Sequence, residues 1–129
     1  MKKGFFINIE EATLKNENYR KVLYTTSESQ LVLMCLQPGD EIGEEVHDLD
    51  QFIRFESGSG EVMVNEQIYV VEDGSAVVVP AGCNHNVTNT GTEPLKLYTV
   101  YTEPEHKDGL IEPTKADEVE EHFDGKTTE

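Results

Sequence analysis

Turn signals recur at short intervals along the middle of this chain, and they constrain its fold more than any other feature. Glycine, proline and asparagine punctuate the stretch from Pro38 to Pro94. Between them lie apolar runs of strand length, with no helical period. This spacing is typical of an antiparallel β sandwich or barrel. We therefore predict an all-β fold built from short strands.

The expected elements follow from the same pattern. We expect strands at residues 5–9, 20–26, 30–36, two within 42–56 that separate near Asp48, and then 61–64, 67–71, 76–79, 85–89 and 95–101. A helical turn is expected over residues 10–14. The run 31–36 is apolar on both faces, which predicts a strand that is covered on both sides. In the acidic tail, residues 103–129, an Asp three residues after Thr114 predicts a short C-terminal helix over 116–123.

Charge and length limit the classes of partner and of location. The chain has 129 residues, enough for one domain that spans residues 1–129, and its formal net charge is −16. Such a surface repels a nucleic-acid backbone or an anionic bilayer, so we expect neither as a partner. No apolar stretch is long enough to span a membrane, and the first nine residues lack the features of a secretory signal. Two cysteines make no disulfide framework, which favours the cytoplasm.

Four polar side chains form a candidate metal site. Glu45 and His47 are two residues apart, so in a strand they share a face, and Gln51 keeps that parity. His85 follows a sharp turn at Pro80–Gly82, and a neighbouring strand must bring it to the other three. Two imidazoles, a carboxylate and an amide suit Zn, Fe, Mn, Ni or Co better than Ca or Mg. The alternative is that each histidine is an ordinary surface or core residue.

Two motifs within residues 39–89 resemble those of the cupin superfamily. The second family motif, at residues 74–89, is matched at every fixed position, namely Gly74, Pro80, Gly82, His85 and Asn89. The first, at residues 39–58, is matched at Gly39, His47 and Gly58. It differs at Glu45, where the family has His, and at Gln51, where the family has Glu. This pattern is similar to a subgroup of small single-domain cupins labelled mannose-6-phosphate isomerase-like.

The resemblance implies a double-stranded β-helix barrel, a divalent metal held by Glu45, His47, Gln51 and His85, and a homodimer. The N-terminal strand could pair across the dimer interface. Between Leu31 and Leu95 the only basic residue is Arg54, whose parity points it away from the metal, against twelve acidic residues. A phosphosugar pocket needs several basic groups, so the isomerase label is not expected to hold literally.

We therefore expect a metal-dependent enzyme, of Lewis-acid isomerase or dioxygenase type, that acts on a small neutral or weakly charged molecule. Glu45, if displaced from the metal, is the candidate general base. The alternatives are a non-catalytic small-molecule sensor or storage protein, and a metal-free structural barrel. Among other residues, Cys83 is expected to be packing and His106 a surface turn, while His122 is expected on a solvated helix face.

Overall fold

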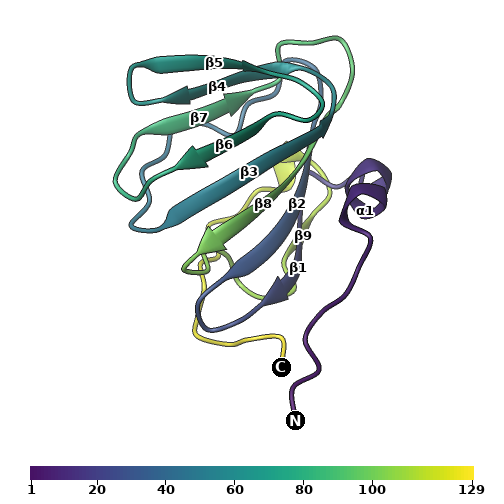
Figure 1. Ribbon diagram of the computed structural model, residues 1–129, viewed down its shortest axis with the longest axis vertical. Coiled ribbons are helices and arrows are strands. Elements are labelled where there is room, and N and C mark those ends of the chain that lie inside the picture. Colours follow the sequence, from purple (N-terminus) through teal and green to yellow (C-terminus); the bar gives the residue numbers. More distant parts are fainter.

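Two antiparallel β sheets form the fold in the computed structural model, which describes all 129 residues (Figure 1). The larger sheet has the strand order β6-β3-β8-β2-β1-β9, and the smaller has the order β5-β4-β7. The strands are β1 (Arg20–Thr25), β2 (Gln30–Leu36), β3 (Asp50–Ser57), β4 (Gly60–Val64), β5 (Gln67–Val71), β6 (Ala76–Val79), β7 (His85–Thr88), β8 (Leu95–Thr102) and β9 (Ile111–Glu112). The predicted all-β architecture is confirmed.

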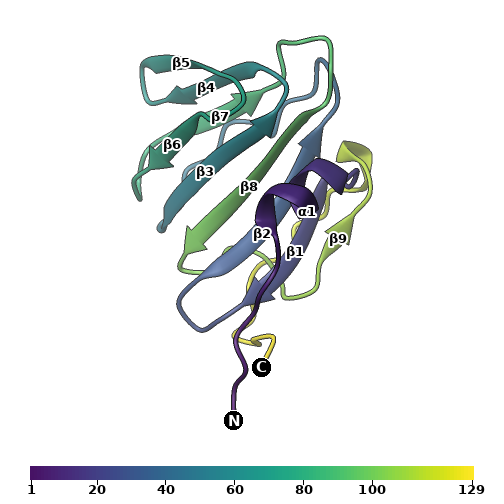
Figure 2. The ribbon, with the colours of Figure 1, turned by 45° about the vertical axis from the view of Figure 1, so that its right-hand side comes forward.

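The core lies between the two sheets because the strands alternate inward apolar and outward residues. Along β8 every second residue is buried, and Ile53 and Phe55 of β3 are fully buried beside Leu97. Burying each such side chain stabilises the fold by about 1.5–3 kcal/mol. Strand β2 is buried on both faces, as its sequence predicts, and Figure 2 shows the helix α1 (Ile9–Lys15) lying across the outer face of the larger sheet.

Motif glycine Gly58 shows why a turn needs this residue type. Its φ is +90°, in the left-handed region, and a Cβ atom placed there would lie 2.5 Å from the carbonyl oxygen of Pro94. Only glycine satisfies both conditions. The turn between β4 and β5 instead uses Asn65, whose φ is +52°. Asparagine tolerates this conformation better than most residues.

The N-terminal prediction is wrong in one element. Residues 5–9 do not form a strand; they are extended and unpaired until α1 begins at Ile9. The side chain of Asn8 caps the helix by accepting a hydrogen bond from Glu11 N at 3.0 Å. The cap and two acidic residues in the first turn explain why a helix forms at 9–15, where only a turn at 10–14 is predicted.

Two further elements are less regular than the sequence predicts. Residues 42–47 form no named strand, although Glu45 pairs with His85 through two backbone hydrogen bonds of 2.9 and 3.0 Å. The C-terminal helix is limited to one 3-10 turn, Lys115–Asp117, with the predicted Thr114 to Asp117 hydrogen bonds. The chain is then extended, because Glu118 is held by Arg20 and Lys115 rather than facing solvent on a helix. None of the helices has the length and apolarity needed to cross a bilayer.

Candidate metal site

A small cavity inside the barrel brings together all four side chains of the predicted site. Glu45, His47, Gln51 and His85 line it, although they come from an irregular segment, β3 and β7. Its volume is about 10 Å³, which is room for a single water-sized particle or ion. The predicted convergence in space is therefore present, and whether a metal binds there is a separate question.

His85 is oriented so that one ring nitrogen is free. Its Nδ1 lies 3.0 Å from the carbonyl oxygen of Cys83, and because a carbonyl only accepts, Nδ1 carries the hydrogen. In the neutral ring, Nε2 is then the nitrogen with the available lone pair. The ring is 6% exposed. A backbone hydrogen bond that fixes the tautomer of a buried histidine is the usual support of a metal ligand.

Gln51 leaves a buried oxygen without a partner. Its Nε2 donates to Thr99 Oγ1 at 3.1 Å, and that hydroxyl donates in turn to the backbone oxygen of Phe52 at 2.8 Å. This chain fixes the amide so that Oε1 is the remaining group. Oε1 is buried and has no hydrogen-bond partner. Such an atom costs about 1–3 kcal/mol when left unpaired, so the cavity favours a water molecule or a cation beside it.

His47 and Glu45 contact each other directly. His47 Nε2 lies 2.9 Å from Glu45 Oε2, and its Nδ1 lies 3.5 Å from Glu105 Oε2. The ring centroids of His47 and His85 are 5.0 Å apart. Two imidazoles that share one ion at about 2.0–2.1 Å have centroids roughly 5 Å apart, so this spacing is compatible with a common ion. Even so, no three His, Cys, Asp or Glu side chains are arranged as a ready-made metal group.

The same contacts shift the ionisation of the pair. Burial alone would raise the pKa of Glu45, but the hydrogen bond from His47 and the charges of His47 and Arg20 outweigh burial and lower it. The bond to Glu45 raises the pKa of His47 more than burial lowers it. At neutral pH Glu45 is therefore a carboxylate. Such a group can accept a proton or bind a cation.

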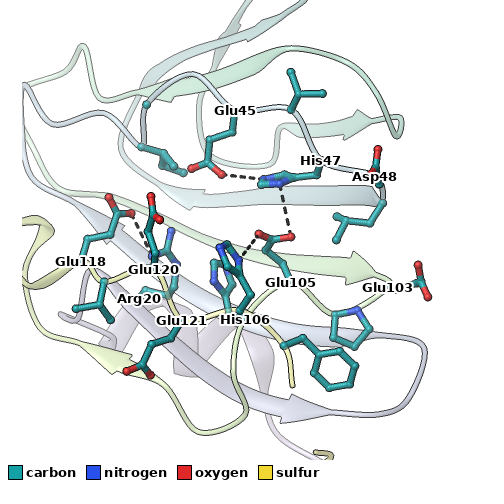
Figure 3. A pocket seen from close by; sticks show the side chains of 18 of the residues that line it. Arg20, Glu45, His47, Asp48, Glu103, Glu105, His106, Glu118, Glu120 and Glu121 are labelled. Carbon is teal, nitrogen blue, oxygen red and sulfur yellow. Dashed lines mark hydrogen bonds and ion pairs between the residues drawn. The ribbon is translucent and has the colours of Figure 1, made fainter. Parts of the chain in front are cut away.

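A larger acidic cavity of about 890 Å³ lies outside the inner one and shares residues with it (Figure 3). The C-terminal segment 103–123 forms one of its walls. Eight acidic residues line the cavity: Glu44, Glu45, Asp48, Glu103, Glu105, Glu118, Glu120 and Glu121. The single Lys or Arg among the lining residues is Arg20, which is already paired with Glu112 and Glu118. The cavity is therefore strongly negative and disfavours anionic ligands.

Sequence reasoning missed the groups that the C-terminal segment adds to this cavity. His106 is not a surface turn: its Nε2 lies 3.3 Å from the hydroxyl of Tyr101, and burial lowers its pKa to about 2. His122 is not on a helix; it pairs opposite His106 and lies 3.3 Å from Glu105. The spacing of these residues carries no motif. Their approach depends on the path of the chain after β8.

Several smaller predictions are confirmed by the packing. Arg54 points outward and pairs with Glu56 at 3.1 Å, away from the inner cavity. Cys83 is half-buried and packs against the hydrophobic core, as expected for a structural thiol. Tyr101 is 3% exposed and lines the inner cavity, and its burial raises the pKa of the hydroxyl, which keeps it protonated.

The strand order and the two motif histidines in one cavity define a double-stranded β-helix barrel of the cupin class. Residues 32–101 match the family model described as Cupin domain. The chain is 46% identical over 125 residues to the uncharacterized protein YrkC of Bacillus subtilis (strain 168), covering 91% of this chain and 67% of YrkC. The chain belongs to the cupin family.

Solved structures agree with this assignment. The crystal structure of BH2720 from Bacillus halodurans is 42% identical, with a TM-score of 0.87 over 89% of this chain and 92% of that one. An uncharacterized double-stranded β-helix protein from Klebsiella pneumoniae has a TM-score of 0.66 at 23% identity, over 78% of this chain and 90% of that one. This second likeness shows the fold alone. The names of these relatives indicate no substrate.

Proposed function

We propose that this protein binds one divalent transition metal in the inner cavity and is a metal-dependent enzyme for a small neutral or weakly charged molecule. The proposed ligands are Glu45, His47, Gln51 and His85. The observation that carries the proposal is the buried, unpaired Oε1 of Gln51, which lines the same cavity as the free Nε2 of His85. A cation between them would bind the lone pairs of both Gln51 Oε1 and His85 Nε2.

The donor set indicates the kind of metal. Two imidazole nitrogens, one carboxylate oxygen and one amide oxygen suit Zn, Fe, Mn, Ni or Co. When bound, such a metal would supply Lewis-acid polarisation of a carbonyl oxygen or, if iron, dioxygen activation. Glu45 and His47 are bonded to each other at 2.9 Å. Metal binding therefore requires that Glu45 and His47 give up their contact with each other and contact the ion instead.

Glu45 is the candidate general base among the residues of this cavity. Its lowered pKa makes it a carboxylate at neutral pH, and its side chain is 34% exposed, so a substrate could reach it from the outer cavity. Tyr101 stays protonated, and Arg20 is held by two carboxylates. Neither is free to take a proton. This leaves Glu45 as the group that would move a proton at a bound substrate once it is displaced from the metal.

The negative charge of the outer cavity supports the proposed class of substrate. Eight acidic residues and one already paired arginine line it. A phosphosugar or another anion would need several basic groups to offset this field. The charges therefore support a neutral or weakly charged substrate and argue against a literal mannose-6-phosphate isomerase activity.

Metal content of protein purified without a His tag tests the proposal. We expect about one transition metal per chain. His85→Ala should abolish binding, while His122→Ala, a matched change of a largely exposed histidine, should keep it. Gln51→Leu should weaken binding because it removes the unpaired oxygen but keeps the side-chain volume. Equal metal content in wild type, His85→Ala and His122→Ala would show that the metal is not bound at this site.

A non-catalytic small-molecule sensor or storage protein is the second candidate. In the inner cavity no proton-transfer group is free besides Glu45, which is itself a proposed ligand, and this favours the sensor or storage role.

A metal-free barrel is the third candidate, favoured by the direct contact of Glu45 with His47. Ultraviolet-visible titration of the Fe(II) form with diketones and flavonoids, followed by product analysis, separates the enzyme from the sensor, and the metal content of the purified protein tests the metal-free barrel. A ligand that raises the melting temperature without conversion supports the sensor, and turnover excludes it.

A further inference from the structure

The carboxylate of Glu105 connects the C-terminal segment to His47, one of the proposed metal ligands. Its Oε2 lies 3.5 Å from His47 Nδ1 (Figure 3), and its Oε1 lies 3.3 Å from His122 Nδ1. The side chains of His47 and Glu105 are 12% and 15% exposed, so solvent screens this pair only in part. Of the acidic residues that line the outer cavity, only Glu45 and Glu105 pair with His47, and they contact different ring nitrogens.

Backbone hydrogen bonds fix the position of Glu105. The amide of Phe123 donates to the carbonyl oxygen of Glu105 at 3.0 Å. The next residue, His106, exchanges two hydrogen bonds of 2.7 and 3.0 Å with the side chain of Gln30, which is 1% exposed on β2. The carboxylate of Glu105 is therefore carried by backbone that is bonded to the larger sheet. This restricts its movement relative to His47.

The contact at His47 Nδ1 involves the ring nitrogen that would not bind the metal. An imidazole that binds an ion through Nε2 carries its hydrogen on Nδ1, and that hydrogen needs an acceptor. For His85 the acceptor is the carbonyl oxygen of Cys83, at 3.0 Å. For His47 the group at Nδ1 is the carboxylate of Glu105. A carboxylate in this position fixes the orientation of the ring and makes its other nitrogen a stronger donor to a metal.

The two acceptors come from different parts of the chain. Cys83 lies within the second motif, at residues 74–89, whereas Glu105 lies outside both motifs and outside residues 32–101, which match the family model. The motifs therefore contain the acceptor for His85 but not the acceptor for His47. That group is brought to the site by the path of the chain after β8.

We propose that Glu105 is a positioning residue of the metal site: its carboxylate holds the Nδ1 hydrogen of His47, so that Nε2 is presented to the ion. This inference rests on the metal binding proposed above. Glu105 acts through His47 and contacts neither the ion nor a substrate. Because Glu45 contacts the other ring nitrogen, Glu105 can keep its contact when Glu45 exchanges His47 for the metal. The C-terminal segment is thus part of the metal site as well as a wall of the outer cavity.

Zinc affinity, measured by competition with a chromophoric chelator, tests the role of Glu105. Glu105→Ala should weaken zinc binding about 10–100-fold, because it removes the acceptor of a ligand histidine. Glu105→Gln should weaken it less, since an amide oxygen still accepts the hydrogen but carries no charge. The matched control is Glu103→Ala, which removes one negative charge from the same cavity at an exposed position. This control should bind zinc almost as tightly as wild type, because solvent screens an exposed charge.

Proton NMR of the zinc-loaded protein provides a readout that a purely structural role of Glu105 would not change. An imidazole N–H bonded to a carboxylate gives a downfield, slowly exchanging signal, because a charge-assisted hydrogen bond is strong. We expect this signal from His47 in wild type and in Glu103→Ala, and its loss or upfield shift in Glu105→Ala. The Nδ1 hydrogen of His85 is the internal reference, since its acceptor is unchanged in all variants.

The outcomes separate this inference from the proposed metal binding. Wild type that binds no zinc overturns both. Wild type that binds zinc, with Glu105→Ala binding as tightly as Glu103→Ala, overturns the role of Glu105 alone. Circular dichroism of the metal-free variants checks that each is folded. If Glu105→Ala does not fold, the nearly isosteric Glu105→Gln decides: zinc affinity and a His47 signal equal to those of wild type would refute the inference.

Discussion

Replacing Arg20 with methionine should remove a large part of the folding free energy. The Arg20 side chain is 4% exposed and Glu112 is 2% exposed, with Arg20 Nη1 lying 2.5 Å from Glu112 Oε1. A second contact of 3.2 Å joins Arg20 to Glu118. Without Arg20, the carboxylate of Glu112 keeps only the hydrogen bond from Val119 N at 2.7 Å. Leaving one buried charge uncompensated costs about 3–5 kcal/mol, out of a typical total of about 5–15 kcal/mol.

Urea unfolding at neutral pH measures this loss. The matched control is Lys15→Met, because the side chains of Lys15 and Glu11 are 74% and 57% exposed and such a surface pair should contribute little. In the double variant Arg20→Met with Glu112→Leu, no buried charge is left, so we expect most of the lost stability to return. The reasoning is refuted if Arg20→Met costs no more than Lys15→Met. It is also refuted if the double variant is as unstable as Arg20→Met alone.

Three further changes probe the turns and the ionisable groups. Gly58→Ala should lower the free energy of unfolding in urea by more than about 2 kcal/mol. The control is Gly74→Ala, which should cost about 1 kcal/mol. Gly74 has a similar φ of +89°, but no atom lies within 4 Å of the added Cβ. Asn89→Ala should lower stability by about 3 kcal/mol, since the buried amide makes three hydrogen bonds to the backbone; a loss below 1 kcal/mol would contradict this estimate. His106 has a folded pKa of about 2, so below its unfolded pKa of about 6.5 the unfolded chain binds a proton that the folded chain does not. Its contribution to stability is therefore present above pH 6.5 and falls by about 1.4 kcal/mol per pH unit below it, and His106→Gln should flatten the stability–pH curve over pH 5–6.5.

Most of the barrel could be predicted from sequence because local rules and burial agree there. Strands β1, β2 and β4 to β8 lie within a residue of their expected bounds, since each is an apolar run closed by a turn signal. The errors fall where local signals compete. Residues 5–9 are rich in apolar and β-branched types, yet they pair with no strand, and the cap at Asn8 starts a helix instead.

The residues of the inner cavity could be predicted from the sequence, while those that the C-terminal segment adds to the outer cavity could not. Parity in β3 and the turn before His85 place the four proposed ligands on facing inner surfaces, as the structure shows. Arg20 and the wall formed by residues 103–123 depend on how the chain folds back after β8. No local pattern specifies that path. Burial of Arg20 follows from tertiary pairing with Glu112, 92 residues away along the chain.

The two departures from the family motif are best understood as one exchange of charge. Relative to the family pattern, the carboxylate moves from position 51 to position 45. In this fold Glu45 accepts a hydrogen bond from His47, and this bond and the charges of His47 and Arg20 lower its pKa, while the amide of Gln51 donates a hydrogen bond to Thr99. A carboxylate at position 51 could not donate that hydrogen bond, and next to Glu45 it would add like-charge repulsion. The hydrogen bond from His47 and the charges of His47 and Arg20 therefore favour the anionic residue at position 45, and the hydrogen bond to Thr99 favours a neutral amide at position 51.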